Sequence, residues 1–223
     1  ELLKSGASVI ALDINLESLS LTFENIKLNS KQKLELHQID LTNKQSVINI
    51  FKETEKLSGA VNCSYPKNKN YGKHLFEVDV DDFNQNVSMH LGSAFHFMQQ
   101  CAQYFKRTQA PFTLVNLSSI YGVITPKFEI YKDTTMTTPI EYVAIKSALI
   151  NVCKYFAKYV CHSDFRVNLV SPGGILDKQP EVFLDAYNSN SFGKGMLDVN
   201  DVIRPILFLL SNESCYINGQ NII

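Results

Sequence analysis

The sequence predicts an α/β protein with a doubly wound, mostly parallel sheet. Strand-like apolar runs alternate with amphipathic helical patterns along the 223 residues, as crossover connections between parallel strands require. Several of these runs end in polar residues, and open α/β sheets bind their ligands at the carboxyl ends of the strands. A composition of 45% hydrophobic and 19% charged residues is that of an ordinary globular domain. We therefore take residues 1–223 as a single domain.

The first part of the chain contains three strand patterns. Apolar runs that end in a polar residue predict strands at residues 7–15, 33–40 and 59–64. Apolar residues at helical spacing follow the first two of them. Thr42 and Gln45 are expected to form the capping box of the second helix.

The rest of the chain continues this alternation. We expect a long helix at residues 81–107, a strand at 112–119, a helix at 141–160 and a strand at 165–174. A long polar segment then leads to the apolar run VIRPILFLL, and a last strand begins at GQNII.

Composition excludes several kinds of partner. A net charge of −1 with scattered lysines provides no basic stripe for nucleic acid or a membrane surface. No apolar run reaches the roughly 18 residues that span a bilayer. The five cysteines are odd in number and lack metal-ligand spacing, so we expect reduced thiols, no metal site and a cytoplasmic protein.

Tyr142 and Lys146 stand four residues apart in EYVAIKSALI. About one Tyr-xxx-Lys match is expected by chance, and the chain has a second one at Tyr65 and Lys69. Pro66 makes a helix unfavourable there, whereas Tyr142 and Lys146 open an apolar-periodic segment and share a helix face. An exposed pair on an amphipathic helix is the alternative.

Ser119 ends the strand before that helix and completes a possible acid/base set. A free tyrosine has a pKa of about 10, so it needs help to exchange protons near neutral pH. The positive charge of Lys146 would favour the phenolate and lower that pKa, while the Ser119 hydroxyl could orient a substrate oxygen.

Acidic residues end the first two predicted strands. Asp13 stands where a carboxylate would accept hydrogen bonds from an adenosine ribose, and no arginine follows it to bind a 2′-phosphate. This favours NAD over NADP. Turn or cap formation is the alternative for Asp13 and, more strongly, for Asp40.

Seven segments together resemble the short-chain dehydrogenase/reductase family in order and approximate spacing. They are LDIN, DLT, VNCSYP, NLSSIYG, YVAIK, RVNLVSPGG and FLLSNESCYINGQNI. The resemblance covers nearly the whole chain and implies a Rossmann-type sheet. It also implies catalytic roles for Ser119, Tyr142 and Lys146, with the last two also at the cofactor. The further cofactor residues that it implies are Asp13, Asp40, Leu41, Asn62, Pro172, Gly173 and Ile175.

The segments NCSYPKNKNYG, SSIYGV followed by FEIY, and SPGGILD followed by QPE carry a closer resemblance. In them the chain is similar to flagellin-modification oxidoreductases of bacterial nonulosonic-acid clusters. That likeness implies an amino sugar, sugar phosphate or nucleotide sugar as substrate. Residues 123–141 form an insert between Ser119 and Tyr142 whose polar side chains suit such a substrate, although a solvated loop is the alternative. Residues 176–198 are expected to be a substrate lid.

The chain also departs from the family pattern. It starts without Met, in what reads as a helix, and lacks the first strand and glycine-rich loop that hold the pyrophosphate. We therefore expect a fragment that binds NAD poorly, with unpaired edges on the strands at residues 8–13 and 60–63. His90 stands where many members have an asparagine that anchors a proton-relay water, and it is either a relay or a helix histidine without a role.

Two other functions remain open. A non-catalytic dehydrogenase-like subunit would bind a nucleotide or a partner enzyme, and a flavodoxin-like domain would bind FMN or no cofactor. The family likeness also implies a homodimer or homotetramer that pairs the helices near residues 87–106 and 142–160. The candidate contacts, which could equally be core residues, are Phe95, Phe97, Tyr155 and Phe156.

Overall fold

The computed structural model describes residues 1–223 and confirms the α/β class with parallel strands. The strands are β1 Val9–Asp13, β2 Leu34–Gln38, β3 Gly59–Asn62, β4 Phe112–Leu117, β5 Phe165–Val170 and β6 Asn221–Ile222. The α-helices are α1 Leu16–Phe23, α2 Lys44–Glu53, α3 Val80–Val87, α4 Ser93–Thr108, α5 Ile140–Val160, α6 Glu181–Ser189 and α7 Val199–Leu210. The shorter helical turns are η1 Leu75–Glu77, η2 Ser88–Gly92, η3 Ile120–Gly122, η4 Phe128–Tyr131 and η5 Asn212–Ser214.

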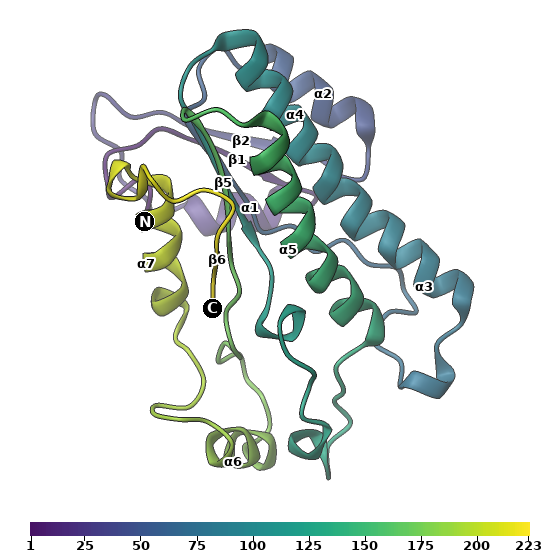
Figure 1. Cartoon of the computed structure of the whole chain (residues 1–223). Coiled ribbons are helices and arrows are strands. Elements are labelled where there is room, and N and C mark those ends of the chain that lie inside the picture. Colours follow the sequence, from purple (N-terminus) through teal and green to yellow (C-terminus); the bar gives the residue numbers. More distant parts are fainter.

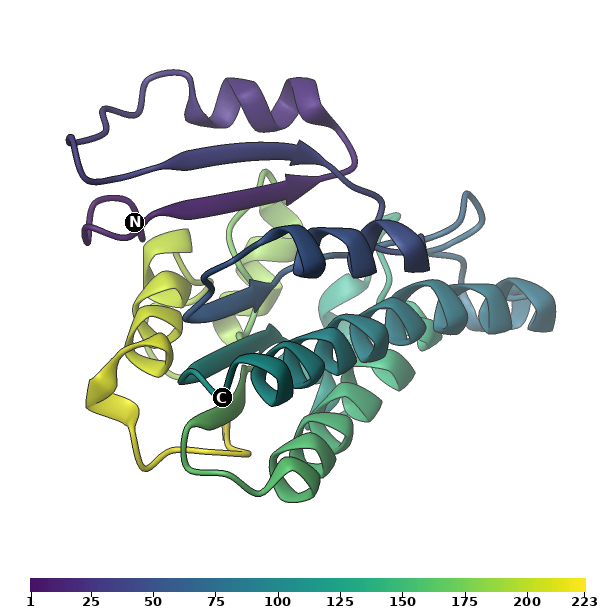
Figure 2. The ribbon, with the colours of Figure 1, turned by 90° about the horizontal axis from the view of Figure 1, so that it is seen from above.

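The strands form two separate hydrogen-bonded sheets. β1 pairs with β2, and the second sheet has the order β3-β4-β5-β6. β1 and β3 are thus each paired on one side only, which confirms the expectation of unpaired edges on these two strands. Figure 2 shows β1 and β2, with α1 beside them, on one side of the remaining strands.

Helices cover both faces of the second sheet. Because successive side chains of a strand point to opposite faces, neighbouring residues of β4 pack against different helices. Leu114 of β4 is fully buried in the large cluster formed with α2, α4 and α5. The next residue, Val115, belongs to a smaller cluster with Val202 and Leu209 of α7. Figure 2 shows α4 and α5 side by side, with α7 away from them across the strands. None of the helices is long and apolar enough to cross a membrane.

The predicted long helix over residues 81–107 is present but irregular. α3 and α4 are joined through η2, a π-helical turn, and α4 ends at Gln109 in the left-handed conformation. π-helical turns interrupt the regular hydrogen-bond ladder and often occur at functional sites. Here the turn contains His90, which is buried.

Two local expectations were wrong. The second helix is capped by Asn43, whose side chain accepts from Gln45 N and Ser46 N, because the Thr42 hydroxyl instead donates to Asp40 Oδ1 over 2.7 Å. The segment ELLKSG forms hydrogen-bonded turns rather than a helix. Of the four candidate interface residues, Phe97 and Phe156 lie in the core, which was the stated alternative, and Phe95 and Tyr155 are exposed.

Arg166 of β5 links the second sheet to the segment at the end of α7. Its buried guanidinium donates to the carbonyl oxygens of Leu209, Ser211 and Ser214 over 3.0–3.1 Å. These carbonyls lie at and just beyond the carboxyl end of α7, where a positive charge is favourable. The side chain therefore connects β5 with α7 and η5.

Candidate active site

The segment after β4 is held against α5 by a side-chain hydrogen bond and by a close backbone contact. The Ser118 hydroxyl donates to the carbonyl oxygen of Lys146 over 2.8 Å. Gly122 of η3 lies so close to α5 that an added Cβ would stand 2.7 Å from the same oxygen. Ile120 N donates to Pro172 O over 2.9 Å, which adds the segment after β5 to this assembly.

The structure brings Ser119, Tyr142 and Lys146 together at this place. Lys146 Nζ donates to Leu117 O over 2.9 Å and lies 5.6 Å from the centre of the Tyr142 ring. Ser119 is buried, and its side chain is among the groups that act on the pKa of Tyr142. Because the two α5 residues are one turn apart, they face the end of β4 together.

The pKa of Tyr142 differs from the prediction. Burial raises the pKa of Tyr142, although the Ser119 side chain partly opposes this. Burial also lowers the pKa of Lys146 to about 8. The predicted lowering of the Tyr142 pKa by Lys146 is therefore absent, because the cost of burying a phenolate dominates and Lys146 makes no resolved contribution.

Tyr65 forms an aromatic wall over these residues. Its ring centre lies 5.8 Å from that of Tyr142 and 5.5 Å from Lys146 Nζ. Its hydroxyl shares a hydrogen bond with that of Tyr71, and Lys67 lies over both rings. In the sequence, Tyr65 was noticed only as part of a chance Tyr-xxx-Lys match. Its position directly after the polar end of β3 was the signal that could have revealed it.

His90 lies behind this wall. Its ring packs edge-on against Tyr65 with the centres 4.9 Å apart. Burial, with a smaller effect of the Lys146 charge, lowers the pKa of His90 to about 3. The imidazole is therefore neutral at physiological pH.

A buried carboxylate precedes Tyr142 and connects α5 to the wall. Glu141 is 1% exposed, and Asn86 Nδ2 of α3 donates to its Oε1 over 3.3 Å. Asn86 Oδ1 in turn accepts from Asn68 N over 2.8 Å, in the loop that carries Tyr65. Glu141 Oε2 has no hydrogen-bond partner. An acidic residue in the first turn of a helix is so common that the sequence contained no sign of this burial.

Apart from Tyr142 and Lys146, which lie on α5, the predicted cofactor residues lie at or after the carboxyl ends of strands in the two sheets. Asp13 and Asp40 end or follow β1 and β2, and both are exposed. Each also makes the turn contact that was the alternative reading, since Asp13 Oδ1 accepts from Asn15 N and Asp40 Oδ1 from Thr42 N. Leu41, which follows Asp40, packs partly buried against the core.

Asn62 and the segment after β5 complete this edge. Asn62 is buried at the end of β3, and its Oδ1 accepts from the Ser64 hydroxyl over 2.7 Å. Pro172, Gly173 and Ile175 follow β5, where Gly173 has room for no large side chain because Tyr187 Oη lies 3.1 Å from its Cβ position.

The predicted insert and lid contact each other. η4 lies in the insert and α6 in the lid, and Figure 1 shows both at the same end of the molecule. The Tyr131 and Phe183 rings have centres 5.2 Å apart, and Tyr187 Oη accepts from Gly174 N over 2.8 Å. We call the space between them the inner hollow, with a volume of about 200 Å³. It is lined by Tyr121, Tyr131, Met136, Thr137, Gly174, Ile175, Gln179, Phe183, Tyr187 and Met196.

Comparison with known proteins identifies the family. A family model described as enoyl-(acyl carrier protein) reductase matches residues 1–223. Post-translational flagellin modification protein A of Campylobacter coli is 35% identical over 100% of this chain and 89% of its own length. The chain belongs to the short-chain dehydrogenase/reductase family. A 3-oxoacyl-[acyl-carrier-protein] reductase of Thermotoga maritima is 28% identical over 97% of this chain and 85% of its own length.

Solved structures agree with this short-chain dehydrogenase/reductase fold. A short-chain dehydrogenase of Leptospira borgpetersenii with bound NAD⁺ has a TM-score of 0.78 and 25% identity, covering 97% of this chain and 91% of that one. A short-chain dehydrogenase of Bacillus anthracis has a TM-score of 0.83 at 18% identity, covering 99% and 86%, and supports the fold alone. The predictions of the family, of the Rossmann-type fold and of an NAD(P)-dependent short-chain oxidoreductase are confirmed.

Proposed function

We propose that this short-chain dehydrogenase/reductase transfers a hydride between NAD and a sugar-type alcohol or ketone, with Tyr142 as the acid/base. The observation that carries the proposal is the convergence of Ser119, Tyr142 and Lys146 at the end of β4. The neighbouring inner hollow is the second support, because Tyr121, which lines it, donates its backbone N–H to Ser119 Oγ over 3.2 Å.

Each residue of the set has a separate task in this proposal. The Ser119 hydroxyl holds the oxygen of the substrate, and Tyr142 donates a proton to that oxygen in reduction or removes one in oxidation. Because burial keeps the phenol protonated, the resting site is poised to donate. Lys146 carries a positive charge at the same place below about pH 8, and its task is to bind the ribose of the cofactor. The nicotinamide group supplies the hydride chemistry when bound.

The residues at the sheet edge fit a nicotinamide dinucleotide. An ammonium group has three donors, and the structure gives Lys146 Nζ one hydrogen-bond acceptor, Leu117 O. The remaining donors suit the hydroxyls of a ribose. The exposed carboxylate of Asp13 would accept from the adenosine ribose and repel a 2′-phosphate, so we propose NAD rather than NADP. The NAD⁺ bound to the Leptospira protein is consistent with this choice.

A sugar suits the inner hollow because its walls combine four hydroxyl groups with apolar surface and carry no charge. Tyr121, Tyr131, Thr137 and Tyr187 contribute hydroxyls, and Gln179 contributes an amide. Aromatic rings beside hydrogen-bonding groups are complementary to the apolar faces and hydroxyl edges of a sugar. The similarity to a flagellin modification protein supports the same substrate class.

Replacing Tyr142 with Phe tests the proposal. We expect loss of turnover with a panel of keto sugars, by about a hundredfold or more because a general acid/base contributes at least that factor. In the full-length protein, calorimetric NAD binding should persist in Tyr142→Phe, with NADP binding more weakly. Tyr159→Phe on the exposed part of the same helix is the control and should keep wild-type turnover.

The result also separates the competing function. Undiminished turnover in Tyr142→Phe would contradict the role of Tyr142. Wild-type protein that binds NAD but reduces or oxidises none of the sugars would favour the non-catalytic subunit.

A further inference from the structure

A second hollow adjoins the inner one on the side of the insert. We call it the outer hollow. It has a volume of about 380 Å³ and is lined by His74, Phe128, Glu129, Tyr131, Lys132, Thr134, Met136 and Thr137. Tyr131, Met136 and Thr137 line both hollows, so the two spaces are neighbours that share a wall.

We propose that the outer hollow binds a second, uncharged ring of a two-part substrate whose reacting part lies in the inner hollow. This inference deepens the proposed function and rests on it for the reacting part. The inner hollow of about 200 Å³ is smaller than the ~300–1,000 Å³ of typical ligand pockets, whereas the two hollows together fall within that range.

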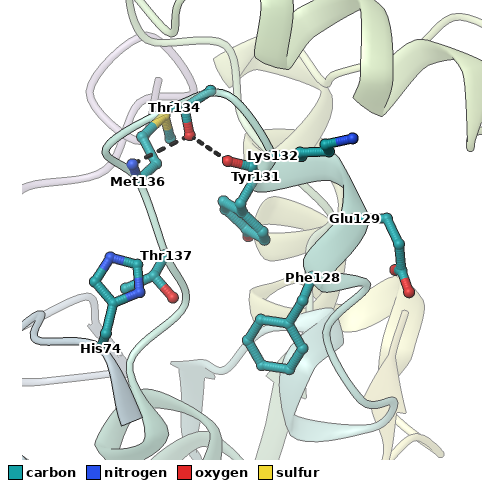
Figure 3. A pocket seen from close by; sticks show the side chains of 8 residues that line it. All are labelled: His74, Phe128, Glu129, Tyr131, Lys132, Thr134, Met136 and Thr137. Carbon is teal, nitrogen blue, oxygen red and sulfur yellow. Dashed lines mark hydrogen bonds between the residues drawn. The ribbon is translucent and has the colours of Figure 1, made fainter. Parts of the chain in front are cut away.

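The walls of the outer hollow suit a flat ring. Figure 3 shows His74 on one side and Phe128 and Tyr131 on the other, with the Thr137 side chain between them. Phe128 is 56% exposed although it is large and apolar, so its ring is available to a ligand. Aromatic rings bind the faces of other rings, and the threonine hydroxyls can bond to a polar edge.

The charged residues of this hollow do not favour an ionic ligand. Figure 3 shows the side chains of Glu129 and Lys132 pointing away from the space between His74 and Phe128. The inner hollow has no charged residue in its lining. The second ring is therefore recognised by its face and its hydrogen-bonding edge, and a nucleobase and a second sugar share that chemistry.

The hollow is built from two segments that are distant in the sequence. His74 directly precedes η1, in the loop that also carries Tyr65, while the other lining residues belong to the insert. Thr134 Oγ1 donates to Tyr131 O over 2.7 Å and accepts from Met136 N, which fixes the turn between the two walls. Binding of a ring would connect the insert to the loop that holds the aromatic wall over Tyr142.

Ligand-observed NMR with two ring probes, uridine and cellobiose, tests the outer hollow. We expect saturation transfer to at least one probe and a loss of affinity of roughly threefold to tenfold in His74→Ala and in Phe128→Ala, the range of one aromatic contact. Phe76→Ala is the matched control, since Phe76 is 99% exposed, two residues from His74 and outside the lining. Thr137→Val keeps the shape of its side chain and tests the polar edge, with circular dichroism as the check on folding.

The possible outcomes distinguish this inference from the proposed function. If uridine or cellobiose binds and its binding weakens in the two variants, the second ring site is supported, even if no sugar is turned over. The probe that binds then identifies the ring as a nucleobase or as a second sugar. Turnover of simple keto sugars without binding of either probe would leave the proposed function intact and overturn this inference. Equal probe binding in wild type and Phe128→Ala would overturn it as well.

Discussion

At the residue scale, the proposed reaction depends on groups that are buried with few partners. Lys146 is a buried cation without a carboxylate beside it, and Glu141 is a buried side chain with a single amide donor. Each arrangement costs folding free energy, because charged and polar groups lose hydration in the interior. Such costs are typical of sites that need a particular charge at a particular place.

Asn86 provides the sharpest test of the buried network. Asn86→Ala removes the donor to Glu141 and the acceptor of Asn68 N, so two buried polar groups lose their partners. We expect the free energy of unfolding to fall by about 2–4 kcal/mol, measured by urea denaturation. Asn84→Ala, an exposed asparagine in the same helix, is the control. Equal effects of the two substitutions would mean that the network contributes nothing to stability.

His90 predicts a specific dependence of stability on pH. Its pKa is about 3 in the folded protein and near 6.5 when unfolded, so between these values only the unfolded state binds the proton. The free energy of unfolding should therefore decrease as the pH falls from 6.5 toward 3, with a contribution of up to about 1.4 kcal/mol per pH unit. His90→Asn should reduce that slope. Urea denaturation at several pH values measures it, and parallel slopes would contradict the assignment.

At the element scale, the position of η3 against α5 decides the geometry of the site. The contact is between backbones at Gly122, so no side-chain adjustment can create room there. Any change that separates these elements moves Ser119 away from Tyr142.

Gly122→Ala is expected to impair both stability and activity. Its Cβ would stand 2.7 Å from Lys146 O, which forces η3 away from α5. We expect turnover to fall by about tenfold or more, since small displacements of reacting groups are costly. Gly92→Ala is the control, because nothing lies within 4 Å of its Cβ position and alanine favours the helix. Wild-type turnover in Gly122→Ala would show that the spacing of η3 and α5 is not critical.

At the scale of the whole molecule, an aromatic surface on α4 and α5 supports the expected homodimer or homotetramer. Tyr155 and Tyr159 are 65% and 77% exposed and stack on each other, and Phe95 of α4 is 45% exposed. Large exposed aromatic residues on adjoining helices are typical of interfaces.

Tyr155→Glu tests that surface. A buried charge at the centre of an apolar interface is unfavourable, so the variant should have a lower mass than wild type by light scattering. Phe192→Glu is the control, because Phe192 is fully exposed on another part of the surface. A monomeric wild type, or an unchanged mass in Tyr155→Glu, would contradict this interface.

The hydrophobic periodicity of the sequence and the positions of its polar residues by themselves determined the class of the fold and the order of the main elements. They also determined that Ser119, Tyr142 and Lys146 lie close together. Periodicity is a local property, and the ends of parallel strands lie at one edge, so these features follow from short segments. Only the tertiary structure decided that Glu141 is buried, that Tyr65 covers Tyr142, and that burial rather than Lys146 controls the pKa of Tyr142. Burial and pKa depend on what other segments place around a side chain, and no single segment contains that information.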